Sequence, residues 1–369
     1  MIVMVGAFPF SVVRSMPDEI RLTESEFARS SPMYFPGSGL VTQNTNSSMR
    51  VGEEESRYIT LRLFGIVPMK RVKVDLLPIE SVLIGGDLIG FNAQIDGVLV
   101  VHSDNKFLEK GDIISKINNS VLIDAHDFDA QIAGIKTGEF FDLCVIRGGR
   151  ARNIRIKKSR EMGIIIKDET TGVGTITFIN PDNNNFSALG HGVGDFETGA
   201  IVPIRGGQIF DMRIFGIDKS RAKKVGSYRS QLRNVESSQG DIAKSTDFGL
   251  SGCLSLNNLL MHNTTRNKYK ISSRYSVKPG KAQIRTTDPD GVTRYFDVQI
   301  IKTRYQKTKS SKSMILRITD KELLEHTGGI IHGMSGSPIV QNGKIVGALT
   351  HVMLGDVTRG YGIYVDWLV

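Results

Sequence analysis

The sequence predicts a mainly β protein, and three observations support this expectation. Glycine supplies 39 residues, which is about 11% of the chain against a usual ~7%, and 11 prolines add further turn signals. Apolar side chains alternate with polar ones at period two, as at Leu61, Leu63, Val72 and Val74, which is typical of strands with one buried face. The length of 369 residues and the hydrophobic content of 40% leave room for two or three domains.

The composition also restricts the kind of site that the chain can carry. The 2 cysteines, Cys144 and Cys253, are far apart and in no metal-ligand spacing, so we expect no disulfide framework, no metal site and no cofactor. The net charge is +9, and the excess lies in residues 161–369, which hold 27 basic and 19 acidic side chains. Because no nucleic-acid motif accompanies this excess, we expect an anionic membrane surface or an acidic protein segment as partner, and no nucleic acid.

The start of the chain differs in composition from the rest. Residues 1–29 are expected to be a truncated membrane anchor or signal-like segment, because residues 1–13 are mostly apolar. This run is shorter than the ~20 residues of a spanning helix and lacks a positively charged flank, so a buried strand is the alternative. Residues 30–57 are polar and rich in turn residues, which predicts a flexible linker and a place for self-cleavage.

Residues 58–158 show the order of elements of a peptide-binding module. A strand over 97–101 precedes the segment 108–118, and a helix follows near 125–135 with Asp124 as its N-cap. Two strands, 140–147 and 151–157, flank the turn Gly148-Gly149. This order resembles a PDZ domain of the kind found in bacterial proteases.

The PDZ resemblance implies a particular ligand site. In such domains, the loop before an apolar-Gly-apolar strand presents backbone N–H groups to a peptide carboxylate, and the strand edge pairs with the peptide. Ile89, Gly90 and Phe91 match that step. The resemblance therefore implies that these three residues bind peptide C-termini.

A short glycine-rich motif in the last part of the chain points to acyl-transfer chemistry. Residues 333–338 read Gly-Met-Ser-Gly-Ser-Pro, where small residues allow the sharp turn that exposes a nucleophile. The N–H groups of Gly333 and Ser335 would then hold the oxyanion of an acyl-transfer intermediate. Residues 338–351 read as strand, Asn-Gly turn and strand, as in the second barrel of chymotrypsin-like proteases. A glycine-rich loop without catalytic function is the alternative.

A serine nucleophile needs a base, and the chain contains 7 histidines. His191 stands among small residues in the segment Ser-Ala-Leu-Gly-His-Gly, far enough before Ser335 to leave room for one barrel between them. It is therefore the favoured base. The other histidines are His102, His126, His262, His326, His332 and His351.

The segments 171–178, 188–192 and 327–331, with the motif that follows them, resemble the SpoIVB serine peptidases of endospore-forming bacteria. The resemblance implies a chymotrypsin-like double β-barrel over residues 159–369, with His191 as base and Ser335 as nucleophile. It also implies that Asp320 is the acid that orients His191. Chymotrypsin-like spacing instead favours an acid 40–60 residues after the base, where Asp241 and Asp247 are available, and Asp320 also fits the N-cap of a helix over 321–326.

The family resemblance further implies a biological setting. Such peptidases are exported by the forespore into the space between its two membranes, either secreted or membrane-anchored. There they process themselves and cleave a regulator in the membrane complex of the intramembrane protease that activates the late mother-cell sigma factor. The alternative function is a non-catalytic scaffold with a PDZ domain that binds the same regulatory proteins.

Overall fold

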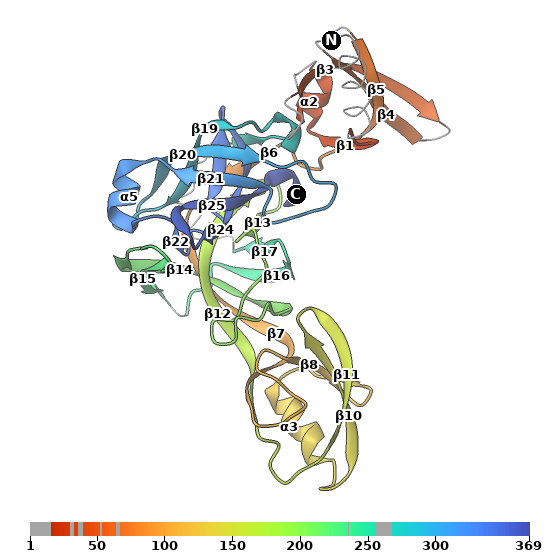
Figure 1. Ribbon diagram of the computed structural model, residues 1–369, viewed down its shortest axis with the longest axis vertical. Helices are drawn as coiled ribbons and strands as arrows, with labels where there is room; N and C mark the ends of the chain where they lie inside the picture. Colours follow the sequence, from red (N-terminus) through yellow and green to blue (C-terminus); the bar gives the residue numbers. More distant parts are fainter. Residues whose placement is uncertain are drawn as a thin grey trace, which may run out of the picture.

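The computed structural model describes most of the chain, and its parts lie one after another along the long axis (Figure 1). The described residues are 16–29, 33–35, 40–51, 54–63, 67–234, 236–255 and 268–369. An N-terminal sheet lies at one end, a pair of β-barrels in the middle, and a small module with one helix at the other end. The prediction of a mainly β protein is confirmed.

The first barrel is a closed ring of six strands. The ring runs from β7 through β12, β13, β17, β16 and β14 and back to β7. The bounds are β7 Leu88–Ser103, β12 Ile164–Ile179, β13 Asn185–Ala188, β14 Ile204–Asp218, β16 Gly240–Thr246 and β17 Gly249–Leu254. Alternate apolar side chains of these strands, such as Ile89, Ile176, Ile209 and Leu250, fill its interior, as expected for strands with one buried face.

The second barrel closes in the same way, so the expected pair of barrels is present. Its ring runs from β19 through β20, β21, β25, β24 and β23 and back to β19. The bounds are β19 Gly280–Thr287, β20 Thr293–Thr303, β21 Met314–Ile318, β23 Pro338–Gln341, β24 Lys344–Met353 and β25 Asp356–Tyr364. The predicted Asn-Gly turn joins β23 to β24, with positive φ angles at both Asn342 and Gly343.

Shorter elements connect and cover the two barrels. Helix α5 follows β21, and two 3-10 helices pack near the C-terminus and before β19. Strand β22 pairs with β15, and β18 lies between β6 and β24. The bounds are β6 Ser81–Ile84, β15 Gly226–Leu232, β18 Lys268–Ile271, η1 Arg274–Ser276, α5 Lys321–Thr327, β22 Ile331–His332 and η2 Val365–Trp367.

The module with the helix is inserted into the first barrel between β7 and β12. It consists of the outer half of β7 with β8 Ile113–Ile117, β9 Ser120–Val121, α3 Ala125–Ala133, β10 Phe140–Arg147 and β11 Arg150–Lys157. It has its own apolar core, centred on Phe128, Phe141 and Leu143. The predicted helix is confirmed, and the Asp124 side chain caps it by accepting a hydrogen bond from Asp127 N. The predicted hairpin at Gly148-Gly149 is also confirmed.

The expected domain boundaries differ from this arrangement. The segment 58–158 is not one unit. Strands β4 (Glu54–Leu63) and β5 (Val67–Leu76) belong to the N-terminal sheet, whereas β6 and the first half of β7 belong to the barrels. The physical reason is that β7 is a continuous strand of 16 residues that serves both the first barrel and the module. An alternating pattern along one strand carries no mark where one partner sheet gives way to another.

The N-terminal sheet occupies the region where a linker was expected. Its strand order is β1-β5-β4-β3-β2, with helix α2 between β1 and β2. The bounds are β1 Glu19–Leu22, α2 Glu24–Ala28, β2 Met33–Phe35, β3 Leu40–Val51, β4 Glu54–Leu63 and β5 Val67–Leu76. Residues 40–51 and 54–57 are therefore strands that pair with each other, not a linker. Their polar and turn-rich composition is typical of a linker, and it did not indicate that the two segments pair as antiparallel strands.

The structure describes only part of residues 1–29, the segment expected to be a membrane anchor. Residues 1–13, which carry its apolar run, lie outside the described residues. Residues 19–28 of the same segment form β1 and α2, and Ile20 and Leu22 are buried in the core of the N-terminal sheet. Within the described part of the chain, no helix has the length and apolar character needed to cross a membrane.

Candidate active site

The Gly-Met-Ser-Gly-Ser-Pro motif forms a tight loop between β22 and β23. Both Gly333 and Gly336 have positive φ angles, +101° and +99°, which favour glycine. A Cβ atom on Gly336 would overlap the carbonyl oxygen of Thr175 and lie 2.6 Å from the Leu189 nitrogen. The loop is thus pressed against β12 and against the end of β13, and only glycine fits at its closest point.

Hydrogen bonds from β12 fix the carbonyl groups of this loop. Thr175 donates through Oγ1 to the Gly333 carbonyl at 2.7 Å and through its backbone N–H to the Ser335 carbonyl at 2.8 Å. Thr177 Oγ1 donates to the Gly336 carbonyl at 2.8 Å. The N–H groups of Gly333 and Ser335, by contrast, have no hydrogen-bond partner among the described residues. This arrangement leaves two donors free for an oxyanion.

His191 follows β13 through a strained turn. Leu189 is buried yet has a φ angle of +71°, which is unfavourable for a branched side chain, and Gly190 follows with +73°. The His191 Nδ1 atom lies 2.8 Å from the Gly192 carbonyl oxygen. With the proton on Nδ1, this contact is a hydrogen bond to that carbonyl, and Nε2 is left with a lone pair to accept a proton.

The electrostatic surroundings keep His191 neutral. Burial lowers its pKa, the nearby His332 lowers it further, and the hydrogen bond with Gly192 opposes this shift. A neutral imidazole at neutral pH is the form that a general base requires.

A second imidazole lies beside the first. The rings of His191 and His351 are 4.9 Å apart between centroids and tilted by 38°. Burial lowers the pKa of His351 to about 4, with further contributions from His191 and Lys312. Its Nδ1 atom is buried without a hydrogen-bond partner among the described residues. Sequence reasoning favoured His191 alone, because the position of His351 on β24 becomes informative only when the barrels are placed side by side.

Ser335 and His191 line one cleft with a volume of about 800 Å³. Its wall also includes His332, Gly333 and residues 169–173 of β12. In this structure, the Ser335 hydroxyl donates to the Thr350 carbonyl at 2.8 Å. The predicted nucleophile, base and oxyanion donors are therefore brought together, with the serine hydroxyl turned toward β24.

Asp320, the expected acid, lies elsewhere. Its carboxylate caps α5, accepting from Leu323 N at 3.0 Å and from Asp297 N at 3.3 Å. It is not among the residues that line the cleft of His191 and Ser335. The structure thus places Asp320 in the helix-capping position that its sequence context also predicted. No carboxylate among the described residues forms an ion pair or hydrogen bond with His191.

The two alternative acids lie on the first barrel. Asp241 is an exposed residue of β16, whereas Asp247 lies in the turn between β16 and β17. The Cα atom of Asp247 is 3.4 Å from the point that a Cβ on Gly192 would occupy, so this turn packs directly against the residue after His191. Of these two candidate acids, Asp247 is therefore the one whose backbone lies next to the segment that carries His191.

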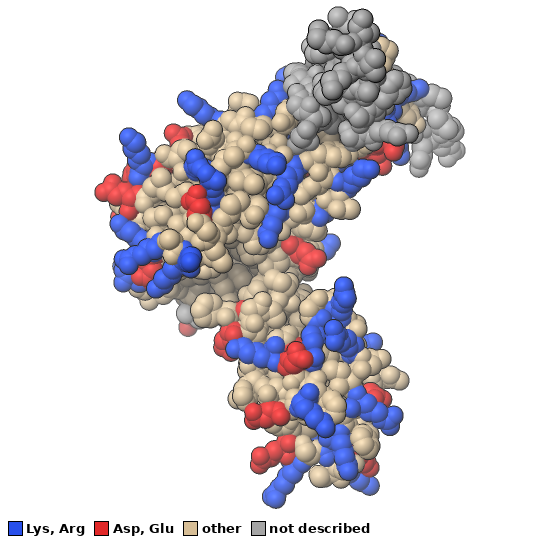
Figure 2. Space-filling model, in the orientation of Figure 1, with Lys and Arg blue, Asp and Glu red and all other residues tan. Residues whose placement is uncertain are grey.

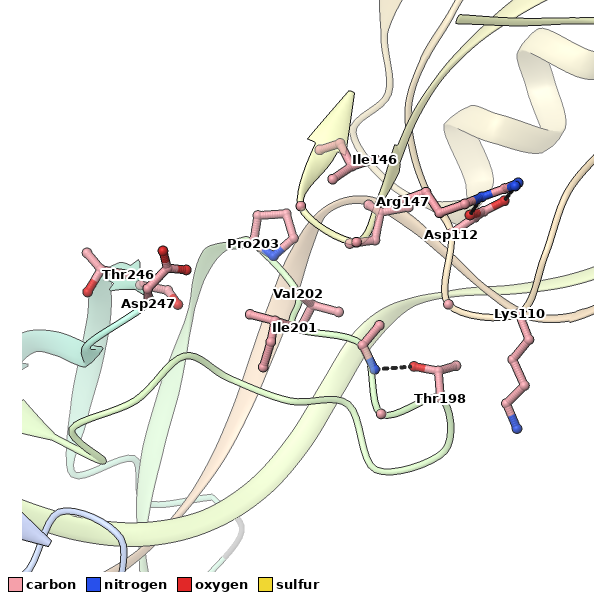
Figure 3. Close-up of a pocket in the computed structure, with 17 residues that line it drawn as sticks. Lys110, Asp112, Ile146, Arg147, Thr198, Ile201, Val202, Pro203, Thr246 and Asp247 are labelled. Atoms are coloured by element: carbon pink, nitrogen blue, oxygen red, sulfur yellow. Dashed lines mark hydrogen bonds and ion pairs between the residues drawn. The ribbon is translucent and has the colours of Figure 1, made fainter. Parts of the chain in front are cut away.

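The side chain of Asp247 lines a separate pocket of about 710 Å³ between the barrel and the inserted module. Figure 3 shows Thr246 and Asp247 on one side of this pocket and the ion pair of Arg147 with Asp112 on the other. Arg147 binds the buried Asp112 at 2.6 Å, which fixes the end of β10 at the pocket.

Ile89, Gly90 and Phe91, the expected cradle for a peptide carboxylate, lie inside the first barrel. They form the part of β7 that pairs with β12 on one edge and β14 on the other. Ile89 and Phe91 are buried in the barrel core. This placement does not match a peptide cradle, because both edges of the strand are already occupied.

No group of three or more His, Cys, Asp or Glu side chains in the described part of the chain could hold a metal ion.

Comparison with known proteins identifies the family of the chain. The family model of the SpoIVB peptidase S55 matches residues 158–369, which include His191, Ser335 and every strand of both barrels except β7. A search of curated proteins found no match. The chain therefore belongs to the SpoIVB peptidase S55 family, a family of serine peptidases that act in sporulation.

Proposed function

We propose that the chain is an endopeptidase in which Ser335 is the nucleophile, His191 is the general base, and the N–H groups of Gly333 and Ser335 hold the oxyanion. The observation that carries the proposal is the nucleophile loop. Its carbonyls are tied to β12, while these two N–H groups remain free beside a neutral imidazole.

The reaction follows from this geometry. The Ser335 hydroxyl leaves the Thr350 carbonyl and turns toward His191, whose Nε2 takes the proton as Oγ bonds to the substrate carbonyl carbon. The carbonyl oxygen becomes negative and is held by the two N–H groups. His191 then gives its proton to the leaving amine as the peptide bond breaks. In the second half of the reaction, the same imidazole takes a proton from a water molecule, and the resulting hydroxide attacks the carbonyl carbon of the acyl-enzyme. The imidazolium then gives this proton to Ser335 Oγ as the ester bond breaks and the acid product leaves.

For the orienting acid, we propose Asp247 in place of Asp320. The His191 Nδ1 atom is directed to the backbone of Gly192, and the Asp247 turn packs against that same residue. A rotation of the Asp247 side chain out of the pocket of Figure 3 is the movement this role requires. Asp320, at the cap of α5, would have to abandon two hydrogen bonds to backbone N–H groups.

Two isosteric variants separate these roles. Asp247→Asn should lower kcat by about 10⁴-fold, as removal of a triad carboxylate does, with little change in the unfolding midpoint. Asp320→Asn should keep both activity and stability, because asparagine caps helices as well as aspartate. If Asp320→Asn loses activity while its stability stays normal, Asp320 is the acid that orients His191, and the proposal for Asp247 fails.

We propose the following biological role, which rests on membership of the family. The enzyme is exported to the space between the forespore membranes, processes itself, and cleaves a regulator of the membrane protease that activates the late mother-cell sigma factor. The inserted module, with its own core, serves as a PDZ-type unit for peptide C-termini. Peripheral or anchored membrane association fits the net positive charge of the chain. On the face drawn in Figure 2, Lys and Arg side chains are interspersed with Asp and Glu over both the barrels and the inserted module.

A peptidase assay with a matched control tests the function. Ser335→Ala should abolish hydrolysis and self-processing, the latter read by N-terminal sequencing. Ser337→Ala removes a buried hydroxyl of the same loop that has no hydrogen-bond partner among the described residues, so it should retain activity. Equal activity in Ser335→Ala and the unaltered chain would contradict the proposal and favour the scaffold.

A further inference from the structure

Two imidazoles meet where the two barrels join. His191 follows β13 of the first barrel and His351 lies on β24 of the second, and both strands are labelled near the middle of Figure 1. The centroids of the two rings are 4.9 Å apart, and the ring planes are inclined by 38°. Among the described residues, no carboxylate forms an ion pair or a hydrogen bond with either ring. The two rings are therefore each other's neighbours without an acid between them.

Each of these rings offers a lone pair that nothing in the described part of the chain uses. With the proton on Nδ1, His191 donates to the Gly192 carbonyl at 2.8 Å, and its Nε2 atom then accepts no hydrogen bond from a described residue. The Nδ1 atom of His351 is buried and likewise has no partner among those residues. A neutral imidazole carries one lone pair whichever nitrogen holds the proton. Two unused lone pairs therefore lie close together.

Protons do not compete for these lone pairs at neutral pH. Burial lowers the pKa of His191, and it lowers the pKa of His351 to about 4. The charge of either imidazolium would also repel the other, because His191 contributes to the lowered pKa of His351. A metal ion binds histidine in its deprotonated form, so both rings are already in the form that a metal requires.

The spacing of the rings matches that of two imidazoles on one metal ion. Zn–N bonds to histidine are ~2.0–2.1 Å long, so two rings at a tetrahedral angle have centroids roughly 5 Å apart. The observed separation of 4.9 Å agrees with this value. Because the rings are inclined by 38° and not parallel, rotations about their side-chain bonds can direct one nitrogen of each ring to a common point.

The cleft gives an ion access to the pair. His191 lines the cleft of about 800 Å³ together with Ser335 and His332. No group of three His, Cys, Asp or Glu side chains among the described residues could hold a metal ion, so water has to complete the coordination. Structural zinc sites use four protein ligands. A site with two protein ligands and open positions is suited to reversible binding.

We propose that His191 and His351 form an inhibitory site for a divalent transition-metal ion of the Zn²⁺ type. This inference rests on the proposed function, because it gives the base a second ligand. An ion on Nε2 of His191 occupies the lone pair that takes the proton of Ser335, so the metal-bound form cannot activate its nucleophile. Imidazole suits Zn²⁺, Cu²⁺ and Ni²⁺, whereas Mg²⁺ and Ca²⁺ prefer oxygen ligands. Removal of the ion restores the enzyme.

One positive charge opposes a cation at this site. Lys312 contributes to the lowered pKa of His351, and its ammonium lies 5.3 Å from the centroid of the Tyr361 ring. Lys312 is exposed, so water and salt screen much of its repulsion. Lys312→Gln should therefore tighten the binding of Zn²⁺, and weaker binding in this variant would contradict a site at His351.

A binding measurement on an inactive chain tests the site apart from catalysis. The full chain with Ser335→Ala keeps both histidines, and titration calorimetry with Zn²⁺ should show a site that weakens at least about tenfold when His351→Gln is added. His102→Gln is the matched control, because it removes a surface histidine beside Asp104 in the inserted module and should leave this site unchanged. Equal Zn²⁺ affinity with and without His351 would overturn the inference, and so would a site that depends on His332 instead.

The rate of labelling by a small fluorophosphonate links the site to the reaction. Zn²⁺ should slow the labelling of Ser335 in the unaltered chain, EDTA should restore it, and Mg²⁺ or Ca²⁺ at the same concentration should have no effect. His351→Gln should need at least about tenfold more Zn²⁺ for the same slowing. Labelling that Zn²⁺ does not slow would refute the inhibitory role. If the unaltered chain is not labelled even without metal, the proposed function itself fails, whereas the calorimetry still decides whether the histidine pair binds Zn²⁺.

Discussion

Gly336→Ala is predicted to be among the most damaging single changes in the nucleophile loop. Its φ angle of +99° costs a residue with a Cβ about 1–3 kcal/mol. The added methyl also overlaps the Thr175 carbonyl and lies 2.6 Å from Leu189 N, and overpacking of this kind costs about 1–3 kcal/mol. The free energy of unfolding should therefore fall by about 2–6 kcal/mol.

Gly343→Ala is the matched control, because it separates backbone strain from overlap. Gly343 also has a positive φ angle, +73°, but a Cβ there would meet no atom within 4 Å. Its substitution should cost only the backbone part, about 1–2 kcal/mol. Urea unfolding is followed by the fluorescence of Trp367, the single tryptophan, which is buried in the second barrel core.

The comparison has a clear refuting result. If Gly336→Ala and Gly343→Ala lower the free energy of unfolding equally, the nucleophile loop does not press against β12 as described. The close contact between Thr175 and Ser335 would then also be in doubt, since the same strand forms both.

Three further predictions concern the base, the loop and the module. Because burial lowers the pKa of His191, kcat/KM should fall only as pH drops through a value below 6.5, and a midpoint above 6.5 would contradict the buried neutral base. Thr175→Val leaves the Gly333 carbonyl without its donor, so the free energy of unfolding should drop by about 1–3 kcal/mol and fluorophosphonate labelling should slow; unchanged labelling would argue against this support. Asp124→Ala should destabilise the inserted module by about 1 kcal/mol, seen as faster hydrogen exchange in α3, with exchange in the second barrel unchanged.

The sequence predicted correctly those caps, turns and loops whose conformation depends only on residues close together in the chain. The helix after Asp124, the hairpin at Gly148-Gly149 and the Asn342-Gly343 turn each depend on a cap or turn chemistry that a few residues encode. The nucleophile loop was predictable for the same reason, since its glycines stand where positive φ angles are needed.

Features that depend on the pairing of strands far apart in the sequence could not be predicted from the sequence alone. The long strand β7 serves both the first barrel and the inserted module, and the burial of Ile89 and Phe91 follows from barrel partners more than 80 residues away. The proximity of His351 to His191 and of Asp247 to Gly192 likewise appears only after the barrel closes. Asp320 fitted two roles in the sequence, and the contacts of its carboxylate show the capping role.

The most direct test of the central claim is to map a covalent adduct. The protein is incubated with a fluorophosphonate, digested and sequenced by mass spectrometry, in the unaltered chain and in Ser335→Ala and His191→Ala. The geometry predicts a single adduct on Ser335, absent from Ser335→Ala and formed far more slowly in His191→Ala. An adduct on another residue, or an adduct on Ser335 that forms equally fast without His191, would contradict the account.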